Sequence, residues 1–367
     1  MKLKKSLSYI VITFIIFNIC SYTAFADDKN SSFREPNINA RCAIAMDSRS
    51  KVVMYQKNAC ELVPMASTTK IMTVLVAIKY GKLDEKVQIS SRSSGIRGSV
   101  VGYKKGENIT LKELLYGLML RSGNDAAIAI SEGVSGSVEE FVKLMNEYAS
   151  EIGVINTHFK TPHGLDKEEH YSTAYDLAVL TSIAKNNALF NKIVSSKDVD
   201  GSQNGFTRSY HNINKILWKI PDANGVKTGY TGKAGKCLVT STKVQGNDVI
   251  IVVLNCPRRW EETEKIYEYV SKNFKFNKLF SKGDNVLELK INKKDLKLEC
   301  EDDVIVPIKN GFKCSVKIIK PQRIKYSINK GDRIGMLCIY EGDKKIYSTS
   351  LRASNSIKVK KFMKWTF

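Results

Sequence analysis

The stretch Ser67-Thr-Thr-Lys70, followed by the apolar run Ile71 to Ile78, says most about the fold and chemistry of this chain. It places a hydroxyl and an amine three positions apart, at the predicted start of a helix that ends near Gly81. Residues i and i+3 share one helical face, so the two groups can meet. A serine is activated when a neighbouring base takes its proton. A lysine can be that base if burial or a nearby cation lowers its pKa.

Two more short motifs follow along the chain. Ser122-Gly-Asn124 lies between two predicted helices, and Lys227-Thr-Gly229 opens a predicted strand, Val226 to Tyr230. Taken singly, Ser67 fits a helix N-cap and Lys227 fits a charge on an edge strand. The ordered trio S-x-x-K, S-x-N and K-T-G is far more specific, because it is the set found in class A β-lactamases and penicillin-binding proteins.

Longer segments around these motifs extend the match. The chain resembles the serine-type D-alanyl-D-alanine carboxypeptidases, which are the low-molecular-mass penicillin-binding proteins of peptidase family S11. The resemblance covers nearly the whole chain and implies an α/β (α+β) fold. In that fold a β-lactamase/transpeptidase-like domain, with a central antiparallel sheet and a helical subdomain, precedes a small all-β domain. The segments that carry it are Pro64–Thr73, Met119–Ala127, Thr161–Asp166, His170–Asp176 and Gly225–Tyr230.

The resemblance implies catalytic roles that the chemistry of the residues supports. Ser67 attacks the carbonyl between two D-alanines and forms an acyl-enzyme, while Lys70 takes its proton. Ser122 relays a proton to the leaving amine, because a hydroxyl both donates and accepts. Water then releases the product. The expected activity is removal of the terminal D-alanine from peptidoglycan pentapeptide stems, which limits cross-linking.

Four further residues are expected to bind the substrate. Asn124 offers an amide to the peptide, and Thr228 can hydrogen-bond the terminal carboxylate. Lys227 is expected to carry a fixed positive charge that attracts this carboxylate and lowers the pKa of Lys70. By resemblance Arg259 helps with the carboxylate, although an exposed structural arginine is an equally good interpretation.

The backbone around the nucleophile should stabilise the oxyanion. The expected donors are the N–H groups of Ser67 and Tyr230, one at a helix start and one on a strand. Gly229 completes the predicted substrate-binding set. His163 and His170 are expected to have structural roles in loops, because Lys70 already supplies the base and the G-x-S-x-G pattern is absent.

Two alternatives to the carboxypeptidase hypothesis remain. A class A-like β-lactamase needs a glutamate that holds a deacylating water, in an E-x-x-L-N loop. The corresponding region, Lys167 to Ser172, has acids without that pattern. We therefore expect β-lactams to act as covalent inhibitors. The second alternative is a catalytically silent wall-binding protein, against which the complete trio argues.

The first 26 residues have the pattern of a secretory signal peptide. Lys2, Lys4 and Lys5 precede the apolar stretch Tyr9 to Ile19, and Ala24-Phe-Ala26 gives an A-x-A cleavage site. An uncleaved N-terminal anchor is the alternative. Cleavage removes three lysines and no acid, and so lowers the formal net charge of +21 by three. We expect an exported protein at the outer face of the cytoplasmic membrane.

The basic charge suggests anionic surroundings, such as wall polymers or lipid head groups. Nucleic acid is not an expected partner, because the protein is exported and its lysines are scattered rather than gathered into a stripe. The segment 357–367 places Val359, Phe362, Met363 and Phe367 on one helical face and three lysines on the other. It is predicted to bind an anionic membrane surface, with a frayed basic tail as the alternative.

Strands at both ends of 35–276, with helices between them, predict one sheet covered by helices in the catalytic domain. Residues 280–355 alternate short apolar strands with turns and predict an all-β domain. The mature chain has seven cysteines. Their spacing does not suggest a metal site, and no cofactor is expected. A Cys42–Cys60 or a Cys237–Cys256 disulfide stays open from sequence alone.

Overall fold

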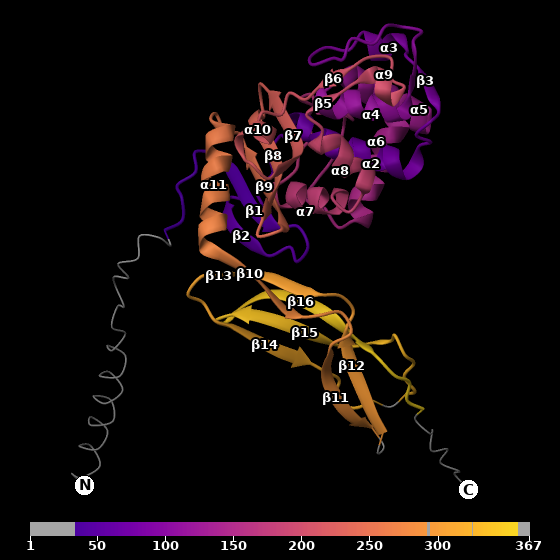
Figure 1. Cartoon of the computed structure of the whole chain (residues 1–367). Coiled ribbons are helices and arrows are strands. Elements are labelled where there is room, and N and C mark those ends of the chain that lie inside the picture. Colours follow the sequence, from indigo (N-terminus) through magenta and orange to yellow (C-terminus); the bar gives the residue numbers. More distant parts are fainter. Residues whose placement is uncertain (1–33, 292–293, 325, 359–367) are drawn as a thin grey trace, which may run out of the picture. The chain divides into compact units, whose positions relative to one another are not determined.

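The structure is a computed structural model that describes residues 34–358, apart from 292–293 and 325 (Figure 1). The predicted signal peptide, 1–26, lies outside the described residues, and so does the predicted tail from residue 359 onward. Within the described part of the chain, no helix is long and apolar enough to cross a membrane.

A five-stranded antiparallel sheet organises the first part of the chain. The strand order is β2-β1-β9-β8-β7, and β1 pairs with β9 through partners such as Cys42 and Leu254. The two ends of this segment therefore lie side by side in one sheet, as the sequence predicted. The strands are β1 (Cys42–Asp47), β2 (Val53–Lys57), β7 (Ala223–Thr231), β8 (Gly235–Val244) and β9 (Asn247–Leu254).

This sheet is buried on both faces, which explains the unbroken apolar sequence of β9. Ile250 and Val252 pack into a core shared with α2 and α7, whereas Ile251 and Val253 pack against α11 (Arg259–Asn273). All four side chains are fully buried. A strand covered on both sides has no solvent face, and so shows no alternation of polar and apolar residues. Figure 1 shows α11 on one side of the sheet and α7 on the other.

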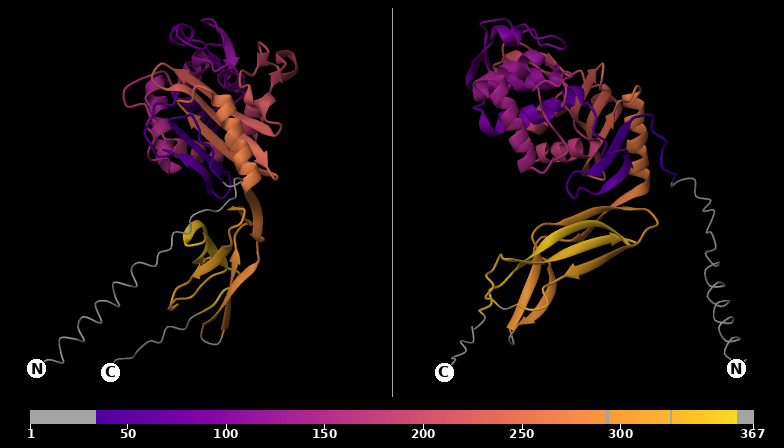
Figure 2. Two further views of the ribbon diagram at one scale, coloured as in Figure 1. Left: turned by 90° about the vertical axis from the view of Figure 1, so that its left-hand side faces the viewer. Right: turned by 180° about the vertical axis from the view of Figure 1, so that it is seen from behind.

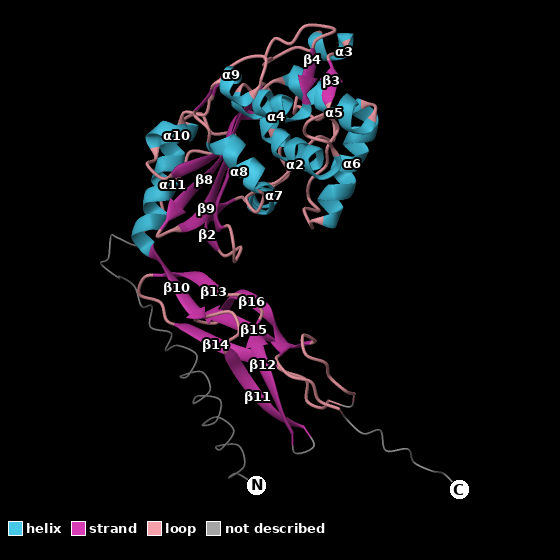
Figure 3. Ribbon diagram, turned by 45° about the vertical axis from the view of Figure 1, so that its right-hand side comes forward, coloured by secondary structure: helices cyan, strands magenta, loops and turns pink. Residues whose placement is uncertain are grey.

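The helices other than α11 lie between β2 and β7 in the sequence, and all helices are coloured cyan in Figure 3. The predicted helix after Ser67 is confirmed, but Ser67 lies in a 3₁₀ turn, η2 (Ala66–Thr69), and the α-helix begins at Lys70. The longer helices are α2 (Lys70–Tyr80), α4 (Leu111–Leu120), α5 (Asn124–Ser135), α6 (Val138–Glu151), α7 (Ala174–Ala184) and α8 (Ala188–Ser195). The short ones are α3 (Ser91–Ser94), α9 (Gly201–Asn204) and α10 (Ile216–Lys219).

Two small antiparallel sheets of two strands each lie among the helices. They are formed by β3 (Lys86–Gln88) with β4 (Asn108–Thr110), and by β5 (Asp198–Val199) with β6 (Tyr210–His211). The start of α4 is capped, because the Thr110 hydroxyl accepts from the Glu113 N–H at 3.2 Å. The Glu113 carboxylate does not complete the capping box. It accepts instead from the Thr207 N–H at 3.0 Å and from the Tyr210 hydroxyl at 2.8 Å, and so ties α4 to the β6 region.

The C-terminal part is all-β, as predicted, and appears in orange and yellow in Figure 2. The sequence from Glu261 to Phe276 predicts a closing helix for the first part of the chain, but α11 ends at Asn273 and Phe274 begins β10. Strands β10 (Phe274–Phe280) and β13 (Val304–Lys309) pair, and a five-stranded sheet has the order β11-β12-β16-β15-β14. Its strands are β11 (Asn285–Ile291), β12 (Lys294–Cys300), β14 (Cys314–Ile319), β15 (Arg333–Glu341) and β16 (Lys344–Ala353).

The all-β part has a core of its own that reaches almost to the end of the described chain. Leu298, Leu337 and Leu351 are fully buried in it. Ile357 is 2% exposed and exchanges backbone hydrogen bonds of 2.8 Å with Ile328. Ile357, which the sequence placed in the tail, therefore packs in this core.

The seven cysteines of the described residues are all free thiols. Neither of the two disulfides left open by the sequence is formed. For Cys237 and Cys256 the reason is geometric, since Cys237 packs on the α2 side of the sheet and Cys256 on the α11 side. Burial raises the pKa of Cys42 and of Cys256 to about 12, so both thiols stay protonated at neutral pH.

The Glu113 contacts predict a specific loss of stability. Glu113→Ala would remove an acceptor from the Thr207 N–H and from the buried Tyr210 hydroxyl, at a cost of about 1–3 kcal/mol. Urea unfolding measures this as a lower midpoint. Glu140→Ala is the control, because the Glu140 carboxylate pairs with the exposed Lys143 on the surface of α6. Equal midpoints for the two variants would contradict the account.

Candidate active site

The predicted nucleophile sits where two other segments approach the η2 backbone closely. A Cβ at Gly229 would lie 3.0 Å from the Ser67 nitrogen, and one at Gly164 would lie 2.0 Å from the Ala66 carbonyl oxygen. Gly164 also has φ +88°, a region that favours glycine. Two glycines thus let the 161–166 loop and β7 meet at the turn that carries Ser67, and Ala66 itself has φ +50°.

Lys70 brings three oxygen atoms together. Its Nζ lies 2.9 Å from Ser67 Oγ, 2.8 Å from Asn124 Oδ1 and 2.7 Å from the carbonyl oxygen of His163. The Lys70 side chain is fully buried, whereas Ser67 is half-buried. The hydroxyl and amine that the sequence places three positions apart are therefore in hydrogen-bond contact.

The surroundings of Lys70 favour the neutral amine. Burial, and then the nearby Lys227, lower the pKa of Lys70 well below its usual value, while the Asp125 carboxylate acts in the opposite direction. A neutral amine has two N–H donors and one lone pair. It can donate to Asn124 and to the His163 carbonyl while its lone pair accepts the Ser67 proton. This arrangement suits a general base.

Ser122 and Asn124 reach the site from the turn between α4 and α5. Ser122 has φ +60° and is 4% exposed, and Asn124 begins α5. The Asn124 amide is held at both ends, because its Nδ2 donates to the Arg97 carbonyl at 2.7 Å while its Oδ1 faces Lys70. The structure thus brings the S-x-N motif against the S-x-x-K motif.

The K-T-G motif lies on β7. Lys227 is 1% exposed and its Nζ donates to the Thr228 carbonyl at 2.9 Å. The side chain of Tyr230 is 68% exposed at the end of the motif. Burial, and then the nearby Arg259, lower the pKa of Lys227 to about 7. A pKa near neutrality differs from the fixed positive charge that the sequence led us to expect for Lys227.

Arg259 is less exposed than its structural interpretation assumed. It is half-buried at the start of α11, and its Nη1 donates to the carbonyl oxygens of Gly229 at 2.7 Å and Cys237 at 3.2 Å. The guanidinium also lies 4.7 Å from the centre of the Trp260 ring. Arg259 thus braces β7 beside Gly229 and adds positive charge near Lys227.

His163 and His170 are buried in the loops around the site. His163 Nδ1 accepts from the Leu165 N–H at 3.1 Å, and His170 Nδ1 accepts from the Lys160 N–H at 3.0 Å. Burial lowers the pKa of His163 to about 3 and that of His170 to about 4, so both rings are neutral at pH 7. These contacts agree with the structural roles expected for the two residues.

Sequence reasoning missed three contributors to the site. The carbonyl of His163 contacts Lys70, but a backbone group leaves no mark in a side-chain pattern. Gly164 is needed for its close approach, and the motif T-P-H-G-L-D that contains it was the available signal. Asp125 binds three backbone N–H groups of the 97–103 loop, and these contacts depend on a loop path that the sequence does not specify.

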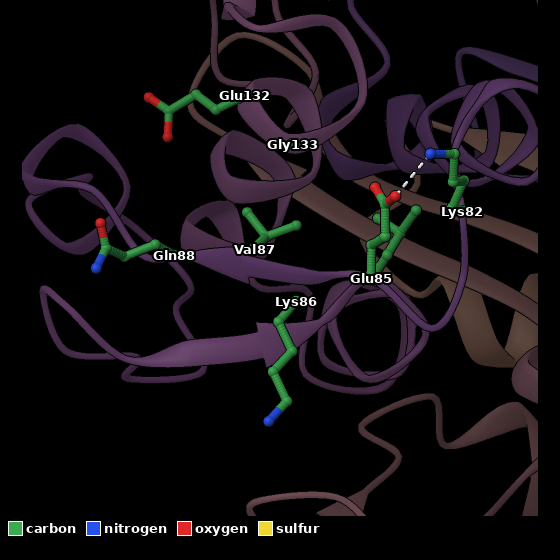
Figure 4. Close-up of a pocket in the computed structure, with 8 residues that line it drawn as sticks. Lys82, Glu85, Lys86, Val87, Gln88, Glu132 and Gly133 are labelled. Carbon is green, nitrogen blue, oxygen red and sulfur yellow. Dashed lines mark hydrogen bonds and ion pairs between the residues drawn. The ribbon is translucent and has the colours of Figure 1, made fainter.

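A separate pocket lies at the other end of α5 (Figure 4). Glu132 and Gly133 line it, together with Lys82 and Glu85, which form an ion pair of 2.7 Å. Asn124 begins the same helix, and at 1.5 Å per residue it lies about 12 Å along the helix axis from Glu132. The pocket contains none of the candidate site residues.

In the described part of the chain, no group of three or more His, Cys, Asp or Glu side chains could hold a metal ion.

Comparison with known proteins agrees with this arrangement. A sequence profile of the D-alanyl-D-alanine carboxypeptidases matches residues 29–258, and one of the C-terminal domain of penicillin-binding protein 5 matches residues 274–359. The D-alanyl-D-alanine carboxypeptidase DacF of Bacillus subtilis is 31% identical over 97% of this chain and 95% of its own length. The D-alanyl-D-alanine carboxypeptidase DacA of Haemophilus influenzae is 30% identical over 92% of this chain and 90% of its own length.

Solved structures show the same similarity. Penicillin-binding protein 5 from Haemophilus influenzae has a TM-score of 0.79 and 29% identity, covering 89% of this chain and 99% of its own. A peptidoglycan synthesis regulatory factor, PBP3, from Streptococcus pneumoniae has a TM-score of 0.73 and 25% identity, covering 88% of this chain and 100% of its own. The similarity thus extends over both the sheet-and-helix part and the all-β part.

The position of Arg259 predicts a measurable pKa change. Arg259→Gln removes the neighbouring charge that lowers the pKa of Lys227, so this pKa should rise above about 7. The check is an NMR titration of protein labelled with ¹⁵N at lysine side chains. Arg258→Gln is the matched control, because Arg258 pairs with Glu262 at 3.6 Å. An unmoved Lys227 titration in Arg259→Gln would refute the assignment.

Proposed function

Because this chain belongs to the D-alanyl-D-alanine carboxypeptidase family, we propose that it removes the terminal D-alanine from peptidoglycan pentapeptide stems through an acyl-enzyme on Ser67. The observation that carries the proposal is the contact of 2.9 Å between the buried Lys70 amine and Ser67 Oγ. Family membership supplies the reaction class, and the site geometry supports the assignment of its residues.

Acylation starts with recognition of the terminal carboxylate. Lys227 in its charged form attracts this carboxylate, and the Thr228 hydroxyl hydrogen-bonds to it. The bound anion in turn favours the charged form of Lys227, and this charge keeps Lys70 neutral. Substrate binding thereby prepares the base. Arg259 supports this step indirectly, because its hydrogen bond to the Gly229 carbonyl holds the end of the K-T-G motif in place.

The chemical step follows from the contacts of Lys70. Its lone pair takes the proton as Ser67 Oγ attacks the carbonyl carbon, and the backbone N–H groups of Ser67 and Tyr230 stabilise the oxyanion. Ser122 passes a proton to the leaving D-alanine amine. Asn124 binds the peptide and positions Lys70. Attack by water then releases the shortened stem and restores Ser67.

A β-lactam enters the same acylation route, and its acyl-enzyme is expected to persist. The nearest acids to a β-lactamase pattern are Glu168 and Glu169, and Glu169 pairs with Lys160 at 2.8 Å with most of its side chain exposed. That pairing gives no support to a deacylating role for Glu169. We therefore propose covalent inhibition by β-lactams rather than their hydrolysis.

The protein is proposed to work in the cell envelope after export by the 1–26 signal peptide, with a 35–276 catalytic domain and a 280–355 all-β domain. The tail is proposed to hold it on an anionic membrane surface. Since Ile357 packs in the all-β core, the lipid-binding part of 357–367 begins after it. The basic composition of the chain is consistent with such surroundings.

The central prediction concerns release of D-alanine. Purified mature protein should liberate D-alanine from a pentapeptide ending in D-Ala-D-Ala and should be labelled by a fluorescent penicillin. Ser67→Ala should abolish both, because the acyl group is carried by Ser67 Oγ. Ser150→Ala, an exposed helical serine, is the control. Labelling that survives Ser67→Ala would place the nucleophile elsewhere.

The tail predicts a separable effect. Removal of residues 359–367 should release the protein from vesicles that contain anionic phospholipid, while D-alanine release stays unchanged. Co-sedimentation with vesicles measures the binding, and vesicles of zwitterionic lipid alone are the control. If the truncated protein sediments with anionic vesicles as the full chain does, the tail is not the anchor.

A further inference from the structure

Asp125 follows Asn124, an expected substrate-binding residue, in the sequence. Its carboxylate accepts several hydrogen bonds from the backbone near the site. Asp125 is 1% exposed. Its oxygens accept from the N–H groups of Val101 at 3.0 Å, Gly102 at 2.8 Å and Tyr103 at 3.2 Å. These three residues end the 97–103 loop, which lies between α3 and β4 (Figure 3). One carboxylate thus fixes three consecutive backbone groups of the loop.

The first residues of the same loop contact Asn124 directly. The Arg97 carbonyl accepts from Asn124 Nδ2 at 2.7 Å, and the Ser99 carbonyl accepts from the Asn124 backbone N–H at 2.7 Å. Gly98 lies between them with φ +92°, and a Cβ there would lie 2.7 Å from Asn124 Nδ2. The start of the loop therefore rests directly on the Asn124 side chain.

The Asn124 amide in turn contacts Lys70, the proposed general base. The Asn124 amide has one oxygen and one nitrogen, so its orientation is fixed only if both ends have partners. Arg97 fixes the nitrogen end, which leaves Oδ1 facing Lys70 Nζ at 2.8 Å. A loop that moves away would let the amide rotate and would remove one of the three oxygen contacts of Lys70.

We propose that Asp125 is a positioning residue for acylation: its carboxylate holds the 97–103 loop against Asn124, and Asn124 in turn holds Lys70 beside Ser67. The proposal rests on the acylation route described above and extends it to a residue that does not touch the substrate. An asparagine does not reproduce these contacts. Oδ2 accepts from all three loop N–H groups and Oδ1 accepts from those of Val101 and Ala126, so an NH₂ group in either position would face a donor.

A general role in capping the helix does not explain these contacts. Asp176 gives the internal comparison, because it also is a buried acid in the first turn of a helix, α7. It accepts from the Asn156 N–H and the Thr157 hydroxyl, each at 2.8 Å, and these contacts do not involve Lys70 or Asn124. Asp176→Asn thus removes a similar buried carboxylate without disturbing the proposed chain of contacts.

The experiment compares second-order rates of acylation by a fluorescent penicillin in full-length wild type, Asp125→Asn and Asp176→Asn. Asp125→Asn should acylate more slowly by about tenfold to a hundredfold, the range expected when a catalytic group is misplaced. Asp176→Asn should stay within about twofold of wild type, even if both variants lose thermal stability. Equal rates for Asp125→Asn and wild type, or an equal loss in Asp176→Asn, would overturn the proposal.

The pH profile separates positioning from charge. The charged and titratable groups around Lys70 are Lys227 on β7, Asp125 on α5 and the neutral His163. Removal of the Asp125 charge should shift the acid limb of acylation to lower pH, because this charge favours protonated Lys70. A purely structural loss would lower the rate at every pH without moving this limb.

A second variant keeps the test informative if Asp125→Asn does not fold. Gly98→Ala presses on Asn124 without touching Asp125, so it should slow acylation and leave the acid limb in place. Wild-type acylation by Gly98→Ala would contradict the importance of the loop. Failure of the wild-type protein itself to form an acyl-enzyme would overturn the proposed function, which distinguishes that outcome from failure of this inference alone.

Discussion

The burial of Lys70 is the constraint on which the site depends. An ammonium group taken out of water without a counter-charge costs several kcal/mol, and a lysine avoids this cost by losing its proton. The fold supplies the burial by placing Lys70 at the first position of α2, whose residues are buried from Lys70 to Ala77. The burial that comes with the first position of α2 therefore favours the neutral, basic form of the Lys70 amine.

Close backbone approach is the second requirement. Three distant parts of the sequence meet at Ser67 and Lys70. The His163 carbonyl of the 161–166 loop and Asn124 of α5 contact Lys70, and Gly229 of β7 lies close to the Ser67 nitrogen. Glycines at 164 and 229 make two of these approaches possible. The pairing of β1 with β9 holds the ends of this segment in one sheet, and β7 lies at its edge. The site thus depends on tertiary closure as well as on its three motifs.

Much of this could be predicted from the sequence where a signal is local. The helix after Ser67, the Thr110 cap and the strands β8 and β9 follow from periodicity and capping residues. Helices α6 and α8 and strand β12, in contrast, are not among the elements that the sequence predicts. The charge state of Lys227 could not be predicted, because it depends on burial and on Arg259, which is 32 residues away. The second partner of Glu113 was equally inaccessible, since Thr207 is distant in sequence.

The role of Asn124 shows the same limit at the level of one side chain. The S-x-N motif predicts an amide in the site, but not that its nitrogen is held by the Arg97 carbonyl or its oxygen by Lys70. Both contacts depend on the path of the 97–103 loop, which no residue pattern encodes. Motifs therefore identify the reacting groups, whereas burial and backbone contacts determine their protonation and orientation.

The pH dependence of acylation by a carboxylate-bearing substrate tests the central claim most directly, because kcat/KM reports the ionisation of groups in the free protein. Neutral Lys70 is required, so the rate should rise through a pKa well below 10.5. Charged Lys227 is also required, so the rate should fall again as pH rises through about 7. A bell-shaped profile is the predicted result. A rate that climbs steadily to alkaline pH would show that Lys70 keeps its proton, and would contradict the account.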